Sequence, residues 1–348
     1  MRALRWHARG DLRLDDVAEL GTPEPGWVRL GIQACGICGT DLEEFQNGPQ
    51  VVPTEPHPLT GTMAPLTLGH ESAGVVLESG PGVDLAVGTR VAVEANVTCG
   101  TCFWCRRGDH QLCEKLSSLG LMANGGLADE MLTPAHLCFP VEDHVSPVTA
   151  ALAEPLAVAV RACSRGGVGP GTSVGIVGAG TIGLLVARVA LAAGAGPVVI
   201  VEPHVKRREL ARASRVHAAV EPDEAAAAAA EITKGIGFDV TFEVAGNPAA
   251  TLSAFRLARR GGRVMLLGVF EDSIKVPMIE LLLDEKELVA SLSHCYDTDY
   301  ARAVDLLNSQ SLVVEDLVTD RVPLDRAVDA FSLLVDDPNE HLKVMVLP

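Results

Sequence analysis

The 348-residue sequence lacks an excess of basic residues: 28 lysines and arginines stand against 45 acidic residues, which leaves a net charge of −17 at neutral pH. That charge repels phosphate backbones and anionic lipid surfaces, so it argues against nucleic-acid binding and against docking on a membrane surface. Disorder and fibrous structure are excluded as well, because 48% of the residues are hydrophobic and only 21% are charged. At about 150 residues per domain, the length predicts two domains.

Long uninterrupted apolar runs are also missing. The stretch MRALRWHARGDLRL carries a charge every few residues and is unlike a signal peptide. The apolar segment 172–201 contains Arg188 and several glycines, which suits a strand, a helix and a second strand better than a bilayer span. We therefore expect a cytoplasmic protein. Its nine cysteines are then expected to be reduced thiols, some of them binding metal, rather than a disulfide scaffold.

The pattern of the sequence changes near Val148. Before it, short β-like runs alternate with Gly and Pro, as in Trp27–Ile32, Gly74–Glu78 and Arg90–Glu94. After it, apolar helical segments alternate with β-branched runs, which predicts an α/β fold with a doubly wound parallel sheet behind a β-rich domain. The segments expected here are Thr149–Arg165, Ser173–Val177, Ile182–Ala193, Val198–Val201, Val205–Ser214, Glu221–Ala230, Asp239–Val244, Ala249–Arg260, Arg263–Gly268 and the helical Tyr300–Asn308.

Four of the nine cysteines lie within fifteen residues, in the loop CGTCFWCRRGDHQLC. Four thiolates satisfy tetrahedral zinc, and such close spacing allows one short loop to surround the ion. An iron–sulfur cluster also uses four thiolates, but the spacing differs and no proline follows the last cysteine. A zinc finger for nucleic acid is disfavoured by the acidic charge. The prediction is a structural zinc site formed by Cys99, Cys102, Cys105 and Cys113.

A glycine-rich motif, G-x-G-x-x-G, is formed by Gly178, Gly180 and Gly183. It follows the β-like run SVGIV and opens an apolar helix, which is the context of a dinucleotide-binding turn. Glu202 ends the next strand, where a carboxylate accepts hydrogen bonds from an adenosine ribose and repels a 2′-phosphate. The motif therefore predicts NAD rather than NADP. Lys206, Arg207 and Arg208 follow, and they either soften this preference or form a solvated helix face.

Three further fragments offer a thiolate, an imidazole and a carboxylate. They are CGICGTD with Cys38, LGHE with His70 and Glu71, and LAEPLAV with Glu154. Each residue alone has an ordinary structural explanation. A catalytic zinc, however, needs about three protein ligands and an open position for a substrate oxygen.

In this order, CGICGTD, GHE, the four-cysteine loop, EPLAV and VGAGTIG resemble the zinc-dependent medium-chain dehydrogenase family over nearly the whole chain. The resemblance implies a GroES-like β domain over residues 1–153, a Rossmann domain that binds NAD over 154–294, and a return to the first domain over 295–348. It implies a catalytic zinc at Cys38, His70 and Glu154, with Glu71 as an alternating or supporting partner. It also implies cofactor contacts from Thr181, Ile182 and Arg207, and a homodimer or homotetramer.

The resemblance further implies hydride transfer between NAD and a secondary alcohol. Glu154 stands where many family members carry cysteine, which places the chain with the polyol dehydrogenases, and the loop GPQVVPTEPHPLTGTMAPLTLGHE is most similar to (R,R)-2,3-butanediol dehydrogenases. Vicinal diols or hydroxyketones are therefore expected first, and polyols or cyclic alcohols second. The rivals are a zinc-free enone or quinone reductase, which would lack Cys38, His70 and the cysteine loop, and a non-catalytic protein that binds NAD and zinc.

Thr40 is placed by the resemblance to take the hydroxyl proton, whereas Asp41 either orients a ligand or supports the turn. Relatives often end this relay in a histidine, where this sequence has Glu43, so the proton leaves through Glu43 or through Glu154 and water. Other expectations concern the pocket and the interface. His57 lines the substrate pocket or anchors its loop, and Phe45 and Leu121 are pocket walls or core. The run Arg263–Val269 resembles a late Rossmann strand whose end contacts nicotinamide, and Ile279–Leu283 near it is expected to form a dimer interface. The remaining cysteines, Cys35, Cys138, Cys163 and Cys295, are expected to be buried.

Overall fold

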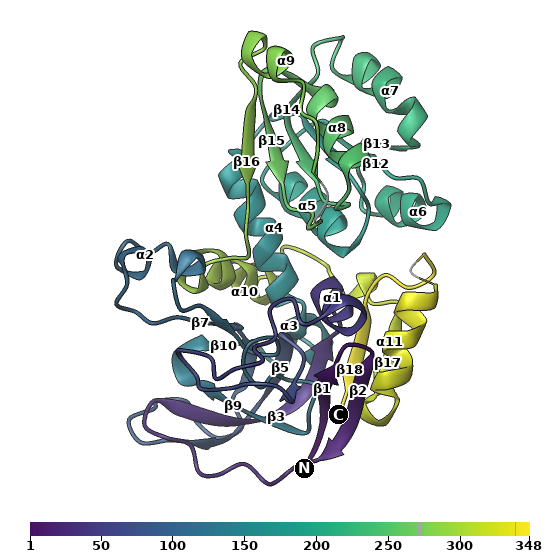
Figure 1. The fold of residues 1–348 in the computed structure, drawn as a ribbon. Coiled ribbons are helices and arrows are strands. Elements are labelled where there is room, and N and C mark those ends of the chain that lie inside the picture. Colours follow the sequence, from purple (N-terminus) through teal and green to yellow (C-terminus); the bar gives the residue numbers. More distant parts are fainter. Residues whose placement is uncertain (271–272, 338) are drawn as a thin grey trace. The chain divides into compact units, whose positions relative to one another are not determined.

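The computed structural model describes residues 1–270, 273–337 and 339–348, and it separates into two compact units (Figure 1). Unit 1 comprises Met1–Ala157 and His294–Pro348, and unit 2 comprises Val158–Ser293. The sequence-based boundary lay at residue 153, whereas unit 1 extends to Ala157, and Glu154 therefore lies in unit 1 rather than in unit 2. Among the described residues, no helix is both long and apolar enough to cross a bilayer.

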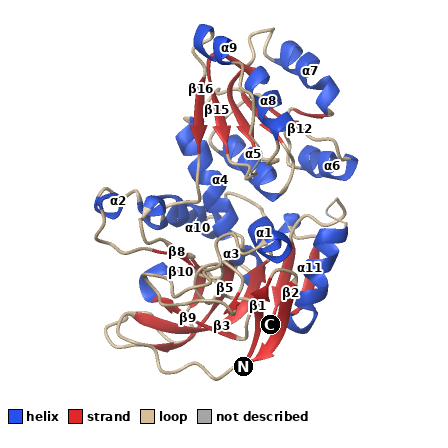
Figure 2. Ribbon diagram, in the orientation of Figure 1, coloured by secondary structure: helices blue, strands red, loops and turns tan. Residues whose placement is uncertain are grey.

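Unit 1 is built mainly from β-sheet (Figure 2). Its larger sheet runs β10-β6-β5-β3-β18-β17, with β9 also pairing with β3. The strands of this sheet are β3 (Trp27–Gly36), β5 (Glu71–Ser79), β6 (Arg90–Val93), β9 (Glu130–Pro134), β10 (Cys138–Pro140), β17 (Asp320–Pro323) and β18 (Val344–Leu347). Two smaller sheets contain β1 (Arg2–Ala8), β2 (Asp11–Asp16) and β4 (Leu66–Thr67), and β7 (Asn96–Val97) with β8 (Ser117–Ser118).

The central strand β3 alternates buried and half-buried residues along most of its length, as expected for a strand with one face on a core. Its C-terminal end pairs antiparallel with β18, where Val346 opposes Cys35. The last residues of the chain therefore complete the sheet of the N-terminal segment. The helices of unit 1 are α1 (Gly39–Asn47), α2 (Phe103–Arg106), α3 (Pro147–Ala151), α10 (Ala301–Asn308) and α11 (Ala327–Asp336), with short turns η1 (His110–Leu112), η2 (Ala135–Leu137), η4 (Tyr296–Tyr300), η5 (Glu315–Leu317) and η6 (Leu324–Arg326).

Unit 2 contains the predicted parallel sheet, in the order β13-β12-β11-β14-β15-β16. The order reverses at β11, and in such sheets the ligand binds at the carboxyl ends of the strands beside this switch. The strands are β11 (Val174–Val177), β12 (Val198–Val201), β13 (Ala218–Val220), β14 (Phe238–Glu243), β15 (Ala258–Leu266) and β16 (Glu287–Ala290). The helices between them are α5 (Thr181–Ala192), α6 (Val205–Ala213), η3 (Pro222–Glu224) with α7 (Ala225–Ile232), α8 (Pro248–Leu257) and α9 (Met278–Leu283).

The helix predicted over Thr149–Arg165 is wrong as a single element. The chain forms α3, which ends at its C-cap residue Leu152, and then α4 (Ala153–Gly166). Pro155 has no N–H to donate to the carbonyl of Ala151, so a continuous helix would lose that hydrogen bond. The new start places Glu154 in the first turn of α4, where the positive end of the helix dipole favours a carboxylate.

Candidate active site

The scattered predicted ligands lie at the ends of two paired strands in unit 1. Cys38 follows β3 and is the N-cap residue of α1. His70 directly precedes β5, and Gly36 of β3 pairs with Glu71 of β5. This register brings three ligand atoms together: Sγ of Cys38, a ring nitrogen of His70 and a carboxylate oxygen of Glu71 lie within 4.8 Å of one another.

The turn before His70 requires glycine. Gly69 has φ +96°, a conformation that other residues rarely adopt. A Cβ atom at this position would lie 2.6 Å from Sγ of Cys35 and 2.6 Å from Cγ of Leu127, and both of these side chains are fully buried. A larger residue would therefore displace the backbone that presents the imidazole of His70.

Asp41 contacts both the turn after Cys38 and the ring of His70. Its Oδ2 accepts the backbone N–H of Cys38 at 2.8 Å, which supports the turn into α1. Its Oδ1 lies 3.3 Å from Nδ1 of His70, and Asp41 is fully buried. Burial alone would lower the pKa of His70, but Asp41 and Cys38 raise it well above its ordinary value. A carboxylate behind one ring nitrogen fixes the direction in which the other nitrogen points.

Glu71 has a cationic partner that the sequence analysis did not identify. Nζ of Lys343 lies 2.6 and 2.7 Å from the two carboxylate oxygens of Glu71, and it donates to the carbonyl of Ile37 at 3.0 Å. Both side chains are buried, and the charge of Glu71 raises the pKa of Lys343 against the opposing effect of burial. Lys343 directly precedes β18, so the pairing of β18 with β3 carries this ammonium group to the site.

Glu154 lies outside the three-residue group of Cys38, His70 and Glu71, although the charges of His70 and Glu71 act on it. Its Oε1 is 3.7 Å from Nδ1 of His294. Burial raises the pKa of Glu154, and the neighbouring histidines oppose that shift. The geometry thus differs from the expected grouping, because Glu71 follows His70 directly in the chain and is drawn in by the strand register.

The chemistry of this donor set fits zinc. A thiolate, an imidazole and carboxylate oxygens are the ligands that zinc takes in catalytic sites, at about 2.0–2.3 Å from the ion. Nδ1 of His70 and Oδ1 of Asp41 are both buried without a hydrogen bond of good geometry in the described structure. With Nδ1 of His70 facing Asp41, the other ring nitrogen is the one available to a metal ion.

The two proposed relay residues lie on α1. Thr40 is exposed, and its Oγ1 lies 3.9 Å from Sγ of Cys38. Glu43 is also exposed, and its carboxylate accepts a hydrogen bond from Nδ2 of Asn47 at 2.9 Å. The two residues are three positions apart, which puts them on the same face of the helix.

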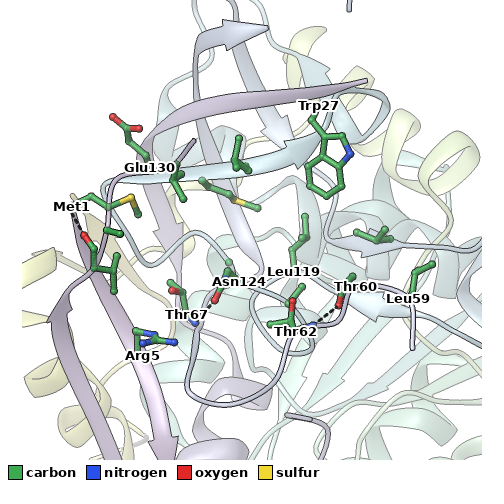
Figure 3. Close-up of a pocket in the computed structure, with 18 residues that line it drawn as sticks. Met1, Arg5, Trp27, Leu59, Thr60, Thr62, Thr67, Leu119, Asn124 and Glu130 are labelled. Atoms are coloured by element: carbon green, nitrogen blue, oxygen red, sulfur yellow. Dashed lines mark hydrogen bonds between the residues drawn. The ribbon is translucent and has the colours of Figure 1, made fainter. Parts of the chain in front are cut away.

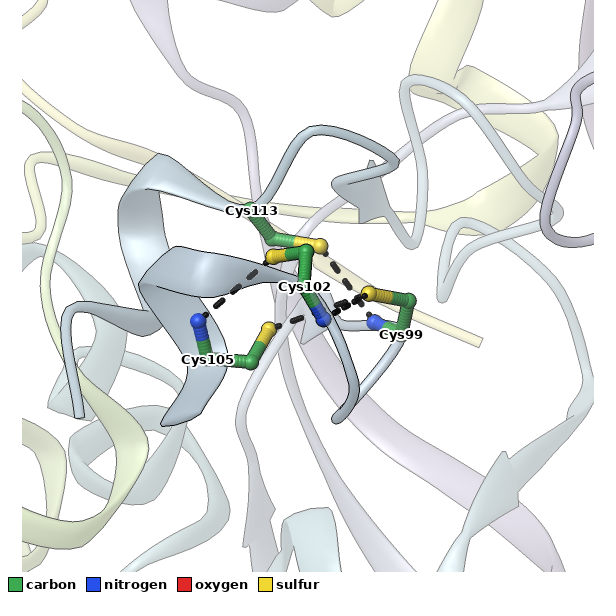
Figure 4. A group of neighbouring side chains, drawn as sticks. All are labelled: Cys99, Cys102, Cys105 and Cys113. Atoms are coloured by element: carbon green, nitrogen blue, oxygen red, sulfur yellow. Dashed lines mark hydrogen bonds between the residues drawn. The ribbon is translucent and has the colours of Figure 1, made fainter. Parts of the chain in front are cut away.

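The four clustered cysteines converge within unit 1, and none of them forms a disulfide (Figure 4). Sγ of Cys99 and Sγ of Cys105 are 4.0 Å apart, close to the spacing of about 3.8 Å between sulfurs on one tetrahedral zinc. Backbone N–H groups donate to three of the sulfurs, those of Cys99, Cys102 and Cys113.

Hydrogen bonding and burial act in opposite directions on these thiols. Hydrogen bonds from the backbone lower the pKa of Cys99 to about 6 and also lower that of Cys102. Burial instead raises the pKa of Cys105 to about 12 and raises that of Cys113. Four ionised sulfurs at this spacing would repel one another, and a divalent cation removes that repulsion.

The glycine-rich turn in unit 2 has the predicted context. Gly178 directly follows β11 with φ +114°, and Gly180 caps α5, which begins at Thr181 and continues with Ile182. A Cβ on Gly183 would collide with the carbonyl oxygen of Gly178, so glycine is required for close packing of the helix on the strand. A Cβ on Gly180 would meet nothing within 4 Å, which leaves the N-terminus of α5 open to a phosphate group.

Glu202 is joined directly to this turn. Its Oε2 accepts the N–H of Ala179 at 2.7 Å, its Oε1 accepts the N–H of His204 at 2.9 Å, and it is only 3% exposed. The basic residues that follow are not equivalent. Lys206 is exposed and Arg207 is half-buried. Arg208 is buried and donates to the carbonyls of Glu202 and Pro203.

The long loop before His70 lines a cavity of about 610 Å³ in unit 1 through Leu59, Thr60 and Thr62 (Figure 3). None of the predicted zinc ligands lines this cavity. His57 serves as the predicted loop anchor, since its Nε2 lies 3.1 Å from the carbonyl of Leu116 and its Nδ1 accepts the N–H of Leu59. Phe45 packs on the ring of Phe331. Leu121 and the other four cysteines are buried, the latter as predicted.

Two known families match this chain. Residues 24–143 match the alcohol dehydrogenase GroES-like domain, and residues 181–309 match the zinc-binding dehydrogenase family. The (R,R)-butanediol dehydrogenase of Bacillus subtilis strain 168 is 33% identical over 357 residues, covering 100% of both chains. The sorbitol dehydrogenase of the same strain is also 33% identical over 357 residues, covering 100% of this chain and 97% of the relative.

Solved structures agree with these matches. The 2R,3R-butanediol dehydrogenase from Bacillus subtilis superimposes with a TM-score of 0.92 at 32% identity, covering 100% of this chain and 99% of that one. A zinc-binding dehydrogenase of Sinorhizobium meliloti 1021, bound to NADP, superimposes with a TM-score of 0.89 at 30% identity over 100% of this chain and 99% of that chain. The chain therefore belongs to the zinc-dependent medium-chain dehydrogenase family and is an oxidoreductase of the alcohol dehydrogenase type.

Proposed function

We propose that this dehydrogenase transfers hydride between NAD and a secondary alcohol, with a vicinal diol or its hydroxyketone, such as 2,3-butanediol and acetoin, as the substrate pair. In the oxidative direction the alcohol loses a hydride to NAD and a proton to the protein, and the products are a ketone, NADH and a proton. The observation that carries the proposal is the convergence of the Cys38 thiol, the His70 imidazole and the Glu71 carboxylate, with Glu154 close enough for the charges of His70 and Glu71 to act on it.

Cys38, His70 and Glu154 are the proposed ligands of the catalytic zinc. Both oxygens of Glu71 are engaged by Lys343, which leaves this carboxylate poorly available to a metal ion. Glu154 is 9% exposed, and among the described residues His294, at 3.7 Å, is its one cationic partner within salt-bridge distance. A shift of Glu154 toward Cys38 and His70 completes the proposed set of zinc ligands, and Glu71 is the alternative third ligand.

When bound, zinc supplies a Lewis acid that lowers the pKa of an alcohol hydroxyl. The protein residues orient the substrate and remove the proton. Thr40 is exposed beside Cys38, so its Oγ1 is available to accept the hydroxyl proton and pass it on. Glu43 lies on the same face of α1 and is open to solvent, which supports it as the outer end of the relay. A Glu43→Gln variant distinguishes this route from the alternative exit of the proton through Glu154 and water. The pH profile of its activity changes only when Glu43 carries the proton.

NAD is the proposed cofactor, held by Gly178, Gly180, Thr181, Ile182 and Gly183. Glu202 supports the preference over NADP, because its carboxylate is fixed against the turn and repels a 2′-phosphate. Arg207, a half-buried basic residue shortly after Glu202, is proposed as a cationic contact to the ribose. Glu202→Ala is expected to lose the selectivity in kcat/KM, and an unchanged ratio of NAD to NADP would reject Glu202 as its source.

Cys99, Cys102, Cys105 and Cys113 are proposed to hold a second, structural zinc, which gives two zinc ions per chain. Four protein ligands leave no position open for substrate. The separation of 4.0 Å between two of the sulfurs and the backbone N–H groups aimed at the others support this role.

The proposed assembly is a homodimer in which two copies meet along the edge strand β16. This strand ends the sheet, and an unpaired edge is a template for a second strand. The neighbouring helix α9 exposes Met278, Ile279, Leu282 and Leu283, each at least 64% exposed. A single polar substitution, Leu283→Asp, is expected to yield monomers in sedimentation velocity.

The substrate is tested by a panel of diols, polyols and cyclic secondary alcohols, followed through the absorbance of NADH. Polyols are the second candidate, since the sorbitol dehydrogenase relative is as similar in identity as the butanediol dehydrogenase. The variant Cys38→Ser is expected to lose activity toward every substrate that the wild type oxidises, while its affinity for NADH stays within twofold of the wild type. Normal oxidation by that variant would reject the catalytic assignment.

A further inference from the structure

A buried carboxylate and a buried imidazole lie behind Glu154 and have no role in the function proposed above. Nε2 of His294 is 2.7 Å from Oε2 of Glu94, and both side chains are completely buried. Nδ1 of the same imidazole is 3.7 Å from Oε1 of Glu154. The three residues form a row in which one imidazole bridges two carboxylates.

Glu94 and His294 are both held in place by the fold of unit 1. Glu94 directly follows β6; its N–H donates to the carbonyl of Leu137 at 2.9 Å, and its Oε1 accepts the N–H of Asn96 at 2.7 Å. His294 is the first residue of the returning chain segment, and the ring of Tyr300 packs against it with centroids 5.5 Å apart. The imidazole is thereby confined between Glu94 and an aromatic ring.

A purely structural role explains this row poorly. Removing charged groups from water costs several kcal/mol per ion, and apolar residues of similar volume generally give equal or greater stability. The row is nevertheless directed at Glu154, whose side chain retains 11% exposure.

We propose that His294, anchored by Glu94, is a positioning residue that aims the carboxylate of Glu154 at the Cys38 and His70 metal site. The inference rests on the proposed role of Glu154 as a zinc ligand. A ligand that is free to rotate loses entropy when it binds the ion, and a ligand held in place has already lost it. Groups that hold metal ligands in this way typically contribute 10–100-fold to metal affinity. His294 is thus the counterpart, on Glu154, of Asp41 on His70.

The test measures zinc affinity rather than activity. The metal-free chain is titrated with zinc against a chromophoric chelator. The titration resolves the four-cysteine site from the proposed site of Cys38, His70 and Glu154, which is called the mixed site below. His294→Phe keeps the ring packed on Tyr300 but removes both nitrogens, and Glu94→Gln keeps the shape of Glu94 but removes its charge. Each is expected to weaken the mixed site 10–100-fold and to leave the four-cysteine site unchanged.

Tyr300→Phe is the matched control, because it alters the same buried wall at a hydroxyl that has no hydrogen-bond partner in the described structure. It should leave both zinc affinities within twofold of the wild type. Should His294→Phe fail to fold because Glu94 is left as an unpaired charge, the double variant with Glu94→Gln removes that charge and still lacks the imidazole.

Glu154→Gln separates the two levels of the proposal. Weakening of the mixed site by Glu154→Gln but not by the His294 and Glu94 variants overturns the positioning role alone. A mixed site that is unaffected by Glu154→Gln overturns both the ligand role and the positioning role. Weakening by all three, with a fall in kcat at an unchanged KM for NAD in the zinc-saturated variants, supports the proposal.

Discussion

The contribution of the buried pair of Lys343 and Glu71 can be tested by measuring the free energy of unfolding. Substituting Lys343→Met leaves the carboxylate of Glu71, which is 1% exposed, without its cation and leaves the carbonyl of Ile37 without a donor. Breaking a buried ion pair in this way costs about 3–5 kcal/mol. We therefore expect the free energy of unfolding of unit 1 to fall by that amount.

A double-mutant cycle isolates the part that belongs to the pair. Glu71→Gln keeps one oxygen that can accept from Lys343, so its expected cost is about 1–3 kcal/mol. The double variant contains neither charge and should lose less than the sum of the two single variants. The expected coupling energy is at least about 2 kcal/mol, because Lys343→Met leaves Glu71 as an unpaired buried charge and Glu71→Gln leaves the ammonium group of Lys343 without a counter-charge.

Tryptophan fluorescence reports this unit selectively, because Trp6, Trp27 and Trp104 are the three tryptophans of the sequence and all lie in unit 1. Urea unfolding is followed with and without a zinc chelator, since a released Glu71 is free to bind the ion. Arg13→Met, which breaks an exposed pair with Asp11, is the control and should not move the midpoint. Additive losses, or a Lys343→Met variant within 1 kcal/mol of the wild type, would refute the reasoning.

Three further predictions concern the other sites. Cys105→Ser should reduce the zinc content by about one ion per chain, and elemental analysis showing no change would reject the four-cysteine site. Gly183→Ala should abolish NADH binding in fluorescence titration, because its Cβ meets the carbonyl of Gly178, and unchanged affinity would contradict that packing. Burial opposes ionisation of Asp239, but Ser173 and Arg259 hold its pKa below the ordinary value. The ionised carboxylate therefore stabilises the fold at pH values above its pKa in the unfolded chain, about 4, and this contribution is lost as pH falls through its pKa in the folded chain. Asp239→Asn should therefore weaken the loss of stability at acidic pH, measured by circular dichroism. An unchanged dependence of stability on acidic pH would exclude Asp239 as a source of that loss.

Local sequence patterns predicted unit 2 well because its elements follow one another along the chain. The strand predicted over Val198–Val201 has those bounds in the structure, and α5 begins and ends one residue before the predicted limits. Here β-branched runs, a glycine turn and an apolar helix all favour the same βαβ arrangement. The single helix predicted over Thr149–Arg165 is wrong because Pro155 cannot donate to the carbonyl of Ala151, and the chain instead starts a new helix at Ala153.

The candidate site was predicted less completely because its supporting residues are distant in the sequence. Lys343 is 272 residues from Glu71, and nothing around it except the following apolar strand indicates that it is buried. His294 and Glu94 come together across 200 residues of sequence. No local periodicity encodes such contacts, which depend on the pairing of β18 with β3 and on the return of the chain to unit 1.

The zinc content of wild-type protein and of Cys38→Ser, measured by elemental analysis after dialysis, tests the central claim most directly. The account predicts about two zinc ions per wild-type chain and about one per chain of the variant, because the four-cysteine loop keeps its ion. A Cys38→Ser variant that retains both ions, or a wild-type chain that holds only the ion of the loop, would contradict the existence of a separate zinc site at Cys38 and His70.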